Sequence, residues 1–166
     1  MAKFSVRALD RRYQQEVLKR FIACAEGAAA ATGATLTVTV HENSGYENMV
    51  PCQPLAERWA AHMRAMGQPV QTTLDDERMG STDMGNVSQI LPAIHPYIGI
   101  APEGTPGHST AFRDAAGTPE AHEAALYAGK ALALVAIDVL AEPALLERAR
   151  AEFEERRKHG TVTGKS

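Results

Sequence analysis

Aromatic residues, cysteines and an excess of positive charge are all scarce or lacking in this chain of 166 residues. Aromatics make up 5% of it, too few for the stacking surfaces of proteins that bind single-stranded nucleic acid. Lys and Arg number 17 against 20 Asp and Glu, so the net charge is -3 and there is no strong positive field for nucleic acid or an anionic membrane. We therefore expect no nucleic acid and no membrane as a partner.

The two cysteines, Cys24 and Cys52, are too few for a disulfide scaffold or a structural zinc knuckle. Neither has an evident His or Asn partner in the sequence, so we interpret both as core or surface thiols. The start of the chain lacks the apolar region of a signal peptide, and the most apolar run, residues 131–140, is too short to span a bilayer. These features predict a soluble, cytoplasmic protein.

Hydrophobic periodicity divides the chain into strands and helices. Alternation of apolar and polar residues predicts strands at 4–9, 35–41 and 93–100. Helical spacing predicts five helices, which begin near residues 10, 54, 83, 119 and 143. Residues 101–117 are rich in Gly and Pro and predict a long loop of the kind that carries function. The pattern as a whole predicts an α/β fold.

Small hydroxyl residues precede a predicted helix in the run GSTDMGNVS at residues 80–88. The free N–H groups and the dipole at a helix N-terminus favour an anion or a carbonyl oxygen. The alternative is a plain helix cap by Ser81, Thr82 or Asp83, and the spacing alone favours that alternative.

His108 stands in a Gly-Pro loop after a predicted strand, within GTPGHSTAF at residues 104–112. Metal-binding and catalytic histidines are often presented in such loops. A loop histidine with only local hydrogen bonds is an equal alternative. The other histidines are more typical of structural or solvent-facing positions: His41, His62, His95, His122 and His159.

Several catalytic and nucleotide-binding motifs are absent, namely the P-loop, G-x-G-x-x-G, G-x-S-x-G, C-x-x-C, H-E-x-x-H and His-x-Asp. The single Glu-Glu pair, Glu154 and Glu155, lies in a terminal run of mixed charge and indicates a solvated helix face. No local motif therefore identifies a complete active site.

The two candidate segments, in this order, resemble the C-terminal part of the zinc-dependent aminoacylase and carboxypeptidase superfamily. The resemblance is carried by GSTDMGNVSQILPAIHPYIGI, by GHSTAFRDAAG and by EAHEAALYAGKALALVAIDVLAEPALLERARAEF. It is closest to the branch of Xaa-Arg dipeptidases and p-aminobenzoyl-glutamate hydrolases. The earlier run FSVRALDRRYQQEVLKRFIACAEGAAAATGATLTV resembles the later half of the family's inserted α/β lid and dimerisation domain.

The resemblance implies a division of the chain. Residues 1–67 would be a partial lid, formed by a strand-helix-strand unit plus a helix. Residues 68–160 would be the C-terminal strands and helices of a metallopeptidase-type catalytic domain, and residues 161–166 a disordered tail.

The resemblance also implies site residues. Such enzymes hydrolyse a dipeptide or an N-acyl amino acid with water activated by two zinc ions, and a glutamate acts as the base. By resemblance, His108 matches a zinc-ligating histidine, and Ser81 and Thr82 match the turn beside the substrate carbonyl. Arg7 and Asn48 would face the substrate carboxylate.

The sequence departs from the family in lacking the motifs of its N-terminal half, which include the His-x-Asp ligand pair and the Glu-Glu pair of base and ligand. One His cannot hold zinc well, so we expect the chain alone to be inactive. A small sheet without its neighbours exposes edges and an apolar face, which predicts a homodimer or association with an N-terminal catalytic half.

Three hypotheses follow. The chain is a split or truncated metal-dependent amidohydrolase of the dipeptidase type, or a non-catalytic dimerisation or binding module that kept the lid's pairing surface. A third hypothesis, a single-zinc site made by His108 and a symmetry mate, would need further ligands such as His95 or His122.

Overall fold

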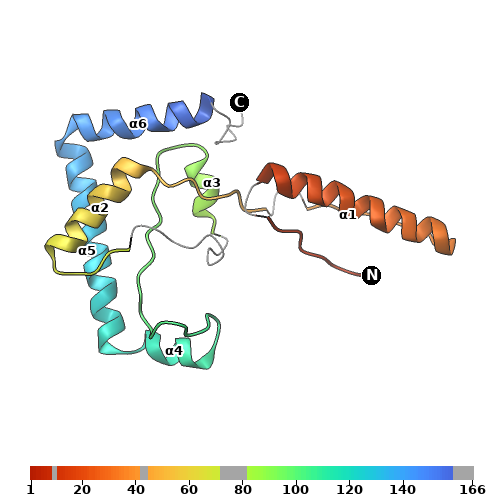
Figure 1. Cartoon of the computed structure of the whole chain (residues 1–166), viewed down its shortest axis with the longest axis horizontal. Coiled ribbons are helices and arrows are strands. Elements are labelled where there is room, and N and C mark those ends of the chain that lie inside the picture. The colour runs from red at the N-terminus through yellow and green to blue at the C-terminus, as the bar shows by residue number, and fades with distance from the viewer. Residues whose placement is uncertain (9–10, 42–44, 72–81, 159–166) are drawn as a thin grey trace.

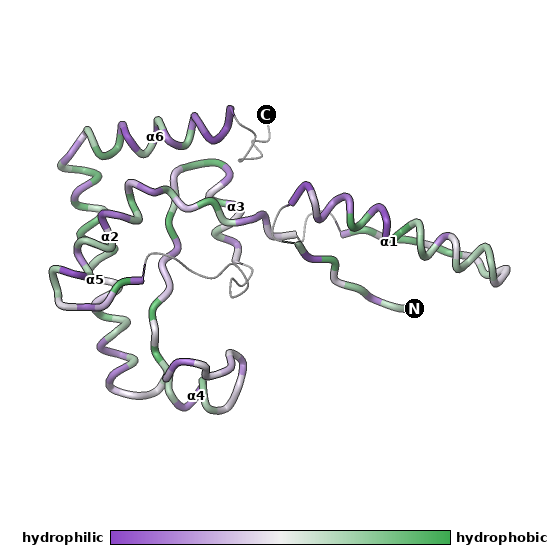
Figure 2. Tube along the Cα trace, viewed as in Figure 1, coloured by the Kyte–Doolittle hydropathy of each residue, from purple (hydrophilic) through white to green (hydrophobic). Residues whose placement is uncertain are grey.

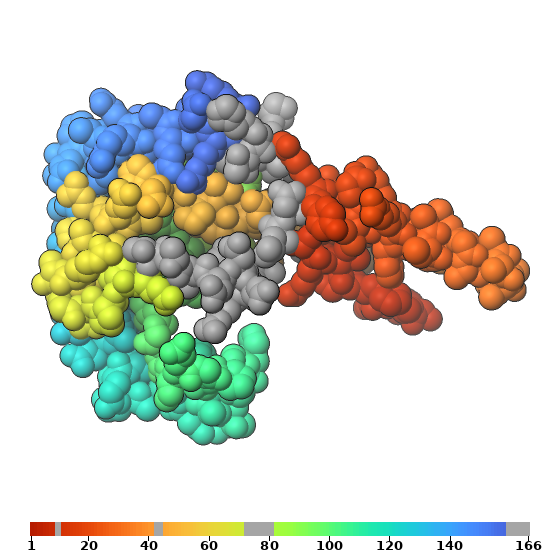
Figure 3. Space-filling view, in the orientation of Figure 1, coloured from red at the N-terminus to blue at the C-terminus, as the bar shows by residue number. Residues whose placement is uncertain are grey.

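The computed structural model of the chain describes residues 1–8, 11–41, 45–71 and 82–158. These residues contain six helices: α1 (Arg11–Thr32), α2 (Gln53–Ala65), α3 (Met84–Ser88), α4 (Thr110–Ala116), α5 (Pro119–Ala141) and α6 (Pro143–Lys158). Helices α2, α5 and α6 pack together and α4 contacts α5 (Figure 1). Helix α1 and the N-terminal segment project from the remainder of the molecule (Figure 3).

The predicted α/β fold with a strand-helix-strand lid is wrong, because the described part of the chain is helical and contains no strand. Residues 35–41 and 93–100 keep the predicted alternation but have no strand, helix or turn assigned, as do residues 4–8 of the first predicted strand. An alternating sequence sets which side chains share a face, whereas a sheet also needs a neighbouring backbone to complete the hydrogen-bond ladder. None of the described segments supplies that neighbour.

The helices themselves are predicted well from their end signals. Helix α5 begins with Thr118, whose side-chain oxygen accepts a hydrogen bond from the N–H of Ala121 at 3.2 Å, and with Pro119 in the first turn. Helix α4 was not predicted, since its residues lie within the expected loop of residues 101–117. Its cap is Ser109, which accepts from the N–H of Phe112 at 3.1 Å.

The hydrophobic core lies between α2 and α5. Trp59, Ala60 and Met63 of α2 pack against Ala131 and Val135 of α5. Ala131 is completely buried, and its small side chain allows the two helices to approach closely at that point. The core therefore depends on a large aromatic ring from one helix and small or β-branched residues from the other.

Four charged or titratable side chains join the same two helices beside the core. His62 Nε2 lies 2.6 Å from Asp138 Oδ2, and Arg58 forms a two-pronged contact with Glu142 at 2.9 and 2.6 Å. The Arg58–Glu142 hydrogen bonds raise the pKa of the Arg58 guanidinium, which stays charged. The polar contacts thus fix how α2 and α5 are aligned.

Helix α1 has no buried residue and packs on no other described helix. Its main neighbour is the N-terminal segment, where the rings of Phe4 and Phe21 lie 4.9 Å apart. Gly33 ends the helix with φ of +68°, and the chain then runs back along α1 (Figure 1). In that returning segment Leu36, Val38 and Val40 are exposed.

Helix α5 is long and apolar enough to cross a membrane, by length and composition alone. The prediction that no such stretch exists is therefore corrected, because it considered only the purely apolar run of residues 131–140 and not the whole helix. Hydrophobic residues recur along the length of α5 (Figure 2).

We expect Leu145→Ala to lower the free energy of unfolding by about 2–5 kcal/mol, since Leu145 is among the largest fully buried side chains. Leu140→Ala is the matched control because Leu140 is 85% exposed. Urea denaturation followed by circular dichroism measures both. Equal effects of the two substitutions would contradict this account of the core.

Candidate functional site

The segment before α2 is fastened to α3 by three hydrogen bonds. The N–H of Glu47 donates to Asn86 Oδ1 at 2.8 Å, and the N–H of Val50 donates to Ser88 Oγ at 3.0 Å. Gln89 Nε2 donates to the carbonyl oxygen of Asn48 at 2.7 Å. Asn48, a predicted substrate-binding residue, is thereby held beside the short helix that follows Thr82.

Gly85 of α3 makes this close contact possible. A β-carbon at position 85 would lie 1.9 Å from the carbonyl oxygen of Glu47, which is far inside van der Waals contact. Gly85 is buried, and Ser88 Oγ donates to its carbonyl oxygen at 2.7 Å. The run DMGNVS therefore needs glycine for the approach of two backbones and not for a special φ.

Thr82 lies at the start of α3 with its hydroxyl among three polar groups. Its Oγ1 accepts from the N–H of Met84 at 3.2 Å and lies 3.3 Å from Nδ1 of His95 and 3.4 Å from Oδ1 of Asp83. The ring of His95 stacks on Tyr97, with centroids 5.3 Å apart. His95, interpreted from the sequence as structural, is thus a direct neighbour of a predicted site residue.

His108 is the only residue other than glycine with a positive φ in the described part of the chain, at +57°. It is exposed and stands directly before Ser109, the cap of α4. A histidine in the left-handed region is uncommon, and residues held this way occur often at functional sites. The backbone thus projects this imidazole from the turn that starts α4.

The described residues do not by themselves fit a zinc ion. No group of three His, Cys, Asp or Glu side chains gathers anywhere among them, so His108 belongs to no set of three ligands there. The third hypothesis concerns a site between two copies, with His95 or His122 as further ligands, and it stays a prediction. Within one copy His95 lies against Thr82 and Tyr97.

Arg7 and Ser81 are not brought to this site. Arg7 is exposed and its Nε donates to Ser5 Oγ at 3.4 Å, and it makes no hydrogen bond or ion pair with the other described site residues. Ser81 lies outside the described residues, as does the predicted tail of residues 161–166. The structure therefore brings Thr82 and Asn48 to opposite ends of one small helix, and no hydrogen bond or ion pair among the described residues joins Arg7 or His108 to either of them.

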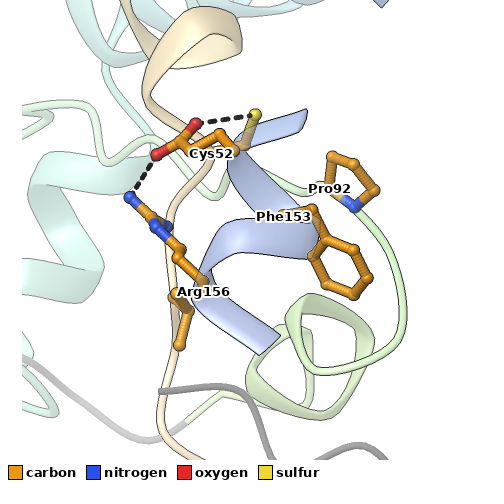
Figure 4. Close-up of a pocket in the computed structure, with 6 residues that line it drawn as sticks. Cys52, Pro92, Phe153 and Arg156 are labelled. Atoms are coloured by element: carbon orange, nitrogen blue, oxygen red, sulfur yellow. Dashed lines mark hydrogen bonds and ion pairs between the residues drawn. The ribbon is translucent and has the colours of Figure 1, made fainter. Parts of the chain in front are cut away.

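A second group of side chains surrounds a pocket where α6 meets the N-terminus of α2 (Figure 4). Cys52 Sγ lies 3.6 Å from Glu152 Oε2, and the same carboxylate oxygen accepts from the N–H of Gln53 at 2.9 Å. Arg156 forms an ion pair with Glu152 and donates to the carbonyl oxygen of Pro51. From the sequence alone we interpret this charge run as a solvated helix face. The spacing of four residues between Glu152 and Arg156 nevertheless indicates an ion pair along one helix.

Burial raises the pKa of the Cys52 thiol, and the adjacent Glu152 carboxylate raises it further. A thiol of raised pKa carries little thiolate near neutral pH and is a poor nucleophile. The contacts around the pocket therefore join α6 to α2, and its thiol is not activated by its surroundings.

Comparison with known proteins confirms the predicted resemblance. No protein-family model matches the chain. It is 35% identical over 150 residues to the Xaa-Arg dipeptidase of Mus musculus and 34% identical to that of Homo sapiens. The match covers 89% of this chain but 34% of each relative, so the chain spans about a third of the length of the curated relatives it matches.

Gly85→Ala should lower the free energy of unfolding by about 1–3 kcal/mol, because the new methyl group would push Glu47 and its segment away from α3. Gly129→Ala is the control: it lies in α5 with open space around it, and should raise stability by up to about 1 kcal/mol. Thermal unfolding measures both, and a neutral Gly85→Ala would refute the tight approach.

Iodoacetamide should modify Cys24 at least about tenfold faster than Cys52 in the folded chain at neutral pH, since Cys24 is exposed and Cys52 is buried with a raised pKa. Mass spectrometry of peptides against time gives the two rates. In guanidinium chloride the difference should disappear. Faster reaction at Cys52 in the native chain would contradict the pocket geometry.

Proposed function

We propose that this chain, a relative of the Xaa-Arg dipeptidases over 150 of its residues, is part of a metal-dependent dipeptidase or amidohydrolase. The observation that carries the proposal is its 34–35% identity to these enzymes over 89% of its length. The reaction is hydrolysis of an amide: water adds to the carbonyl carbon, the C–N bond breaks and the amine leaves with a proton.

In this proposal Thr82 and Asn48 serve the substrate side of the site. The Thr82 hydroxyl accepts from the N–H of Met84 and donates to Asp83 Oδ1 at 3.4 Å, so it would have to turn its proton from Asp83 to bind a carbonyl oxygen of the substrate. Asn48 is held through its backbone by Gln89, which leaves the orientation of its side chain amide independent of that contact. Arg7 and Ser81 would complete the contacts with the dipeptide.

In this proposal His108 would supply one imidazole to a metal ion, and the other donors and the general base would come from another polypeptide portion. Its left-handed backbone and exposure support this role. A catalytic zinc takes three protein ligands, so the site is complete only when another polypeptide portion joins. The substrate class we propose is a dipeptide or an N-acyl amino acid.

A second candidate function is a non-catalytic dimerisation or binding module. It is supported by the exposed Leu36, Val38 and Val40, which form an apolar row beside α1 at alternating positions. In this alternative a second copy covers that row and the chain has no role in hydrolysis.

We expect the isolated chain with added zinc to show no hydrolysis of Xaa-Arg dipeptides, and activity to appear when the chain is co-expressed with the part of mouse Xaa-Arg dipeptidase that lies outside the match. His108→Ala should then lower kcat at least about a hundredfold, since it removes a metal ligand.

His122→Ala is the matched control, because His122 is also an exposed histidine and lies in the first turn of α5. It should leave kcat within about twofold of the unsubstituted complex. Robust turnover by the isolated chain, or full activity of the His108→Ala complex, would refute the proposed function.

A further inference from the structure

His95 is held in place from both sides along the chain. The carbonyl oxygen of Ala93 accepts from the N–H of Cys52 at 2.8 Å, and Ile94 packs against the core between α2 and α5. On the other side, Pro96 restricts the backbone of His95 to extended conformations. The place of this imidazole is therefore set by the residues that flank it.

The ring of His95 is oriented by Tyr97. Positions 95 and 97 share one side of an extended backbone, and the two rings stack with centroids 5.3 Å apart and planes 28° apart. In this orientation Nδ1 of the imidazole lies 3.3 Å from Oγ1 of Thr82. His95 thus presents one particular ring nitrogen to that hydroxyl.

Thr82 is restrained separately, by helix α3. Its carbonyl oxygen accepts from the N–H of Gly85 at 3.1 Å, and its Oγ1 accepts from the N–H of Met84 at 3.2 Å. Helix α3 is in turn hydrogen-bonded to the segment before α2. The approach of Thr82 to His95 is therefore fixed by two anchors that do not depend on the contact itself.

The Thr82 hydroxyl has one proton to donate and two lone pairs that can accept. The N–H of Met84 occupies one lone pair, and Oδ1 of Asp83 lies 3.4 Å away as an acceptor for the proton. A carboxylate attracts this proton more strongly than a neutral imidazole nitrogen does. The nitrogen of His95 that faces Oγ1 must then be a donor, because two lone pairs facing each other would repel.

We propose that His95 is a positioning residue whose Nδ1–H donates to Thr82 Oγ1 and turns the hydroxyl proton away from the imidazole. The contact with Asp83 is longer than an ordinary O–H···O hydrogen bond, so a carbonyl oxygen of the substrate can replace Asp83 at little cost. With the other tautomer, Nδ1 would accept the proton and Thr82 would have none to offer. This inference rests on the proposed function and adds to it the residue that directs the Thr82 hydroxyl.

The tautomer is measured by NMR of the ring nitrogens in the chain labelled at histidine, at slightly alkaline pH. We expect Nδ1 of His95 to be protonated. Thr82→Val removes the acceptor and should lower the fraction of this tautomer at least about twofold, whereas Thr82→Ser keeps the hydroxyl and should leave it unchanged. The exposed His122 is the internal control and should respond to neither substitution. A bare Nδ1 on His95 overturns the inference.

Kinetics test the directing role, in the complex of this chain with the part of mouse Xaa-Arg dipeptidase that lies outside the match. His95→Phe removes Nδ1 but keeps a ring that can stack on Tyr97. It should lower kcat at least about tenfold and leave KM within about threefold, since a hydrogen bond to the carbonyl oxygen strengthens in the transition state. In a Thr82→Val background the same substitution should lower kcat by less than about twofold, because the hydroxyl that it directs is absent.

His122→Phe is the matched control and should leave kcat within about twofold of the unsubstituted complex. An equal fall of kcat from His95→Phe with and without the Thr82 hydroxyl would overturn the inference, since a structural role does not depend on that hydroxyl. Its failure differs from that of the proposed function. A complex that hydrolyses no dipeptide refutes the function, and the NMR measurement still decides whether His95 donates to Thr82. An active complex in which His95→Phe is neutral refutes the inference alone.

Discussion

The contact between α2 and α5 is the constraint on which the remaining structure depends. Trp59 and Met63 meet Ala131 and Val135 there, and the ion pairs beside them fix the alignment of the two helices. Because a hydrophobic contact is non-directional, the packing alone would permit sliding, and the 2.6 Å contact of His62 with Asp138 opposes it. Helix α6 contacts both helices, and Ile94 and Ile98 pack against the core between them.

The candidate site is positioned by backbone contacts more than by its own side chains. Asn48 is fixed through its carbonyl oxygen, Gly85 through the absence of a β-carbon, and His108 through its left-handed φ. Such restraints specify where a side chain begins and leave its outer atoms free to meet a substrate or a metal. The described residues thus present separate parts of a candidate site.

Much of this could be predicted from the sequence, and the failures have a common physical cause. The start of α5 followed from Thr118 and Pro119, which are local signals, and the relationship to dipeptidases followed from long motifs. The strands at residues 35–41 and 93–100 were wrong because alternation reports a face and not a neighbour. The contact of Thr82 with His95 was missed because nothing local links positions 13 residues apart.

Glu152 illustrates how far such a link can extend. Its carboxylate accepts from the N–H of Gln53, 99 positions earlier, and so completes the first turn of a helix in another region of the chain. Removing α6 would therefore fray the N-terminus of α2, because the N–H of Gln53 would lose the Glu152 carboxylate that accepts its hydrogen bond. How far this protein can be shortened from its C-terminus thus depends on α2, which begins at residue 53 and needs Glu152 to complete its first turn.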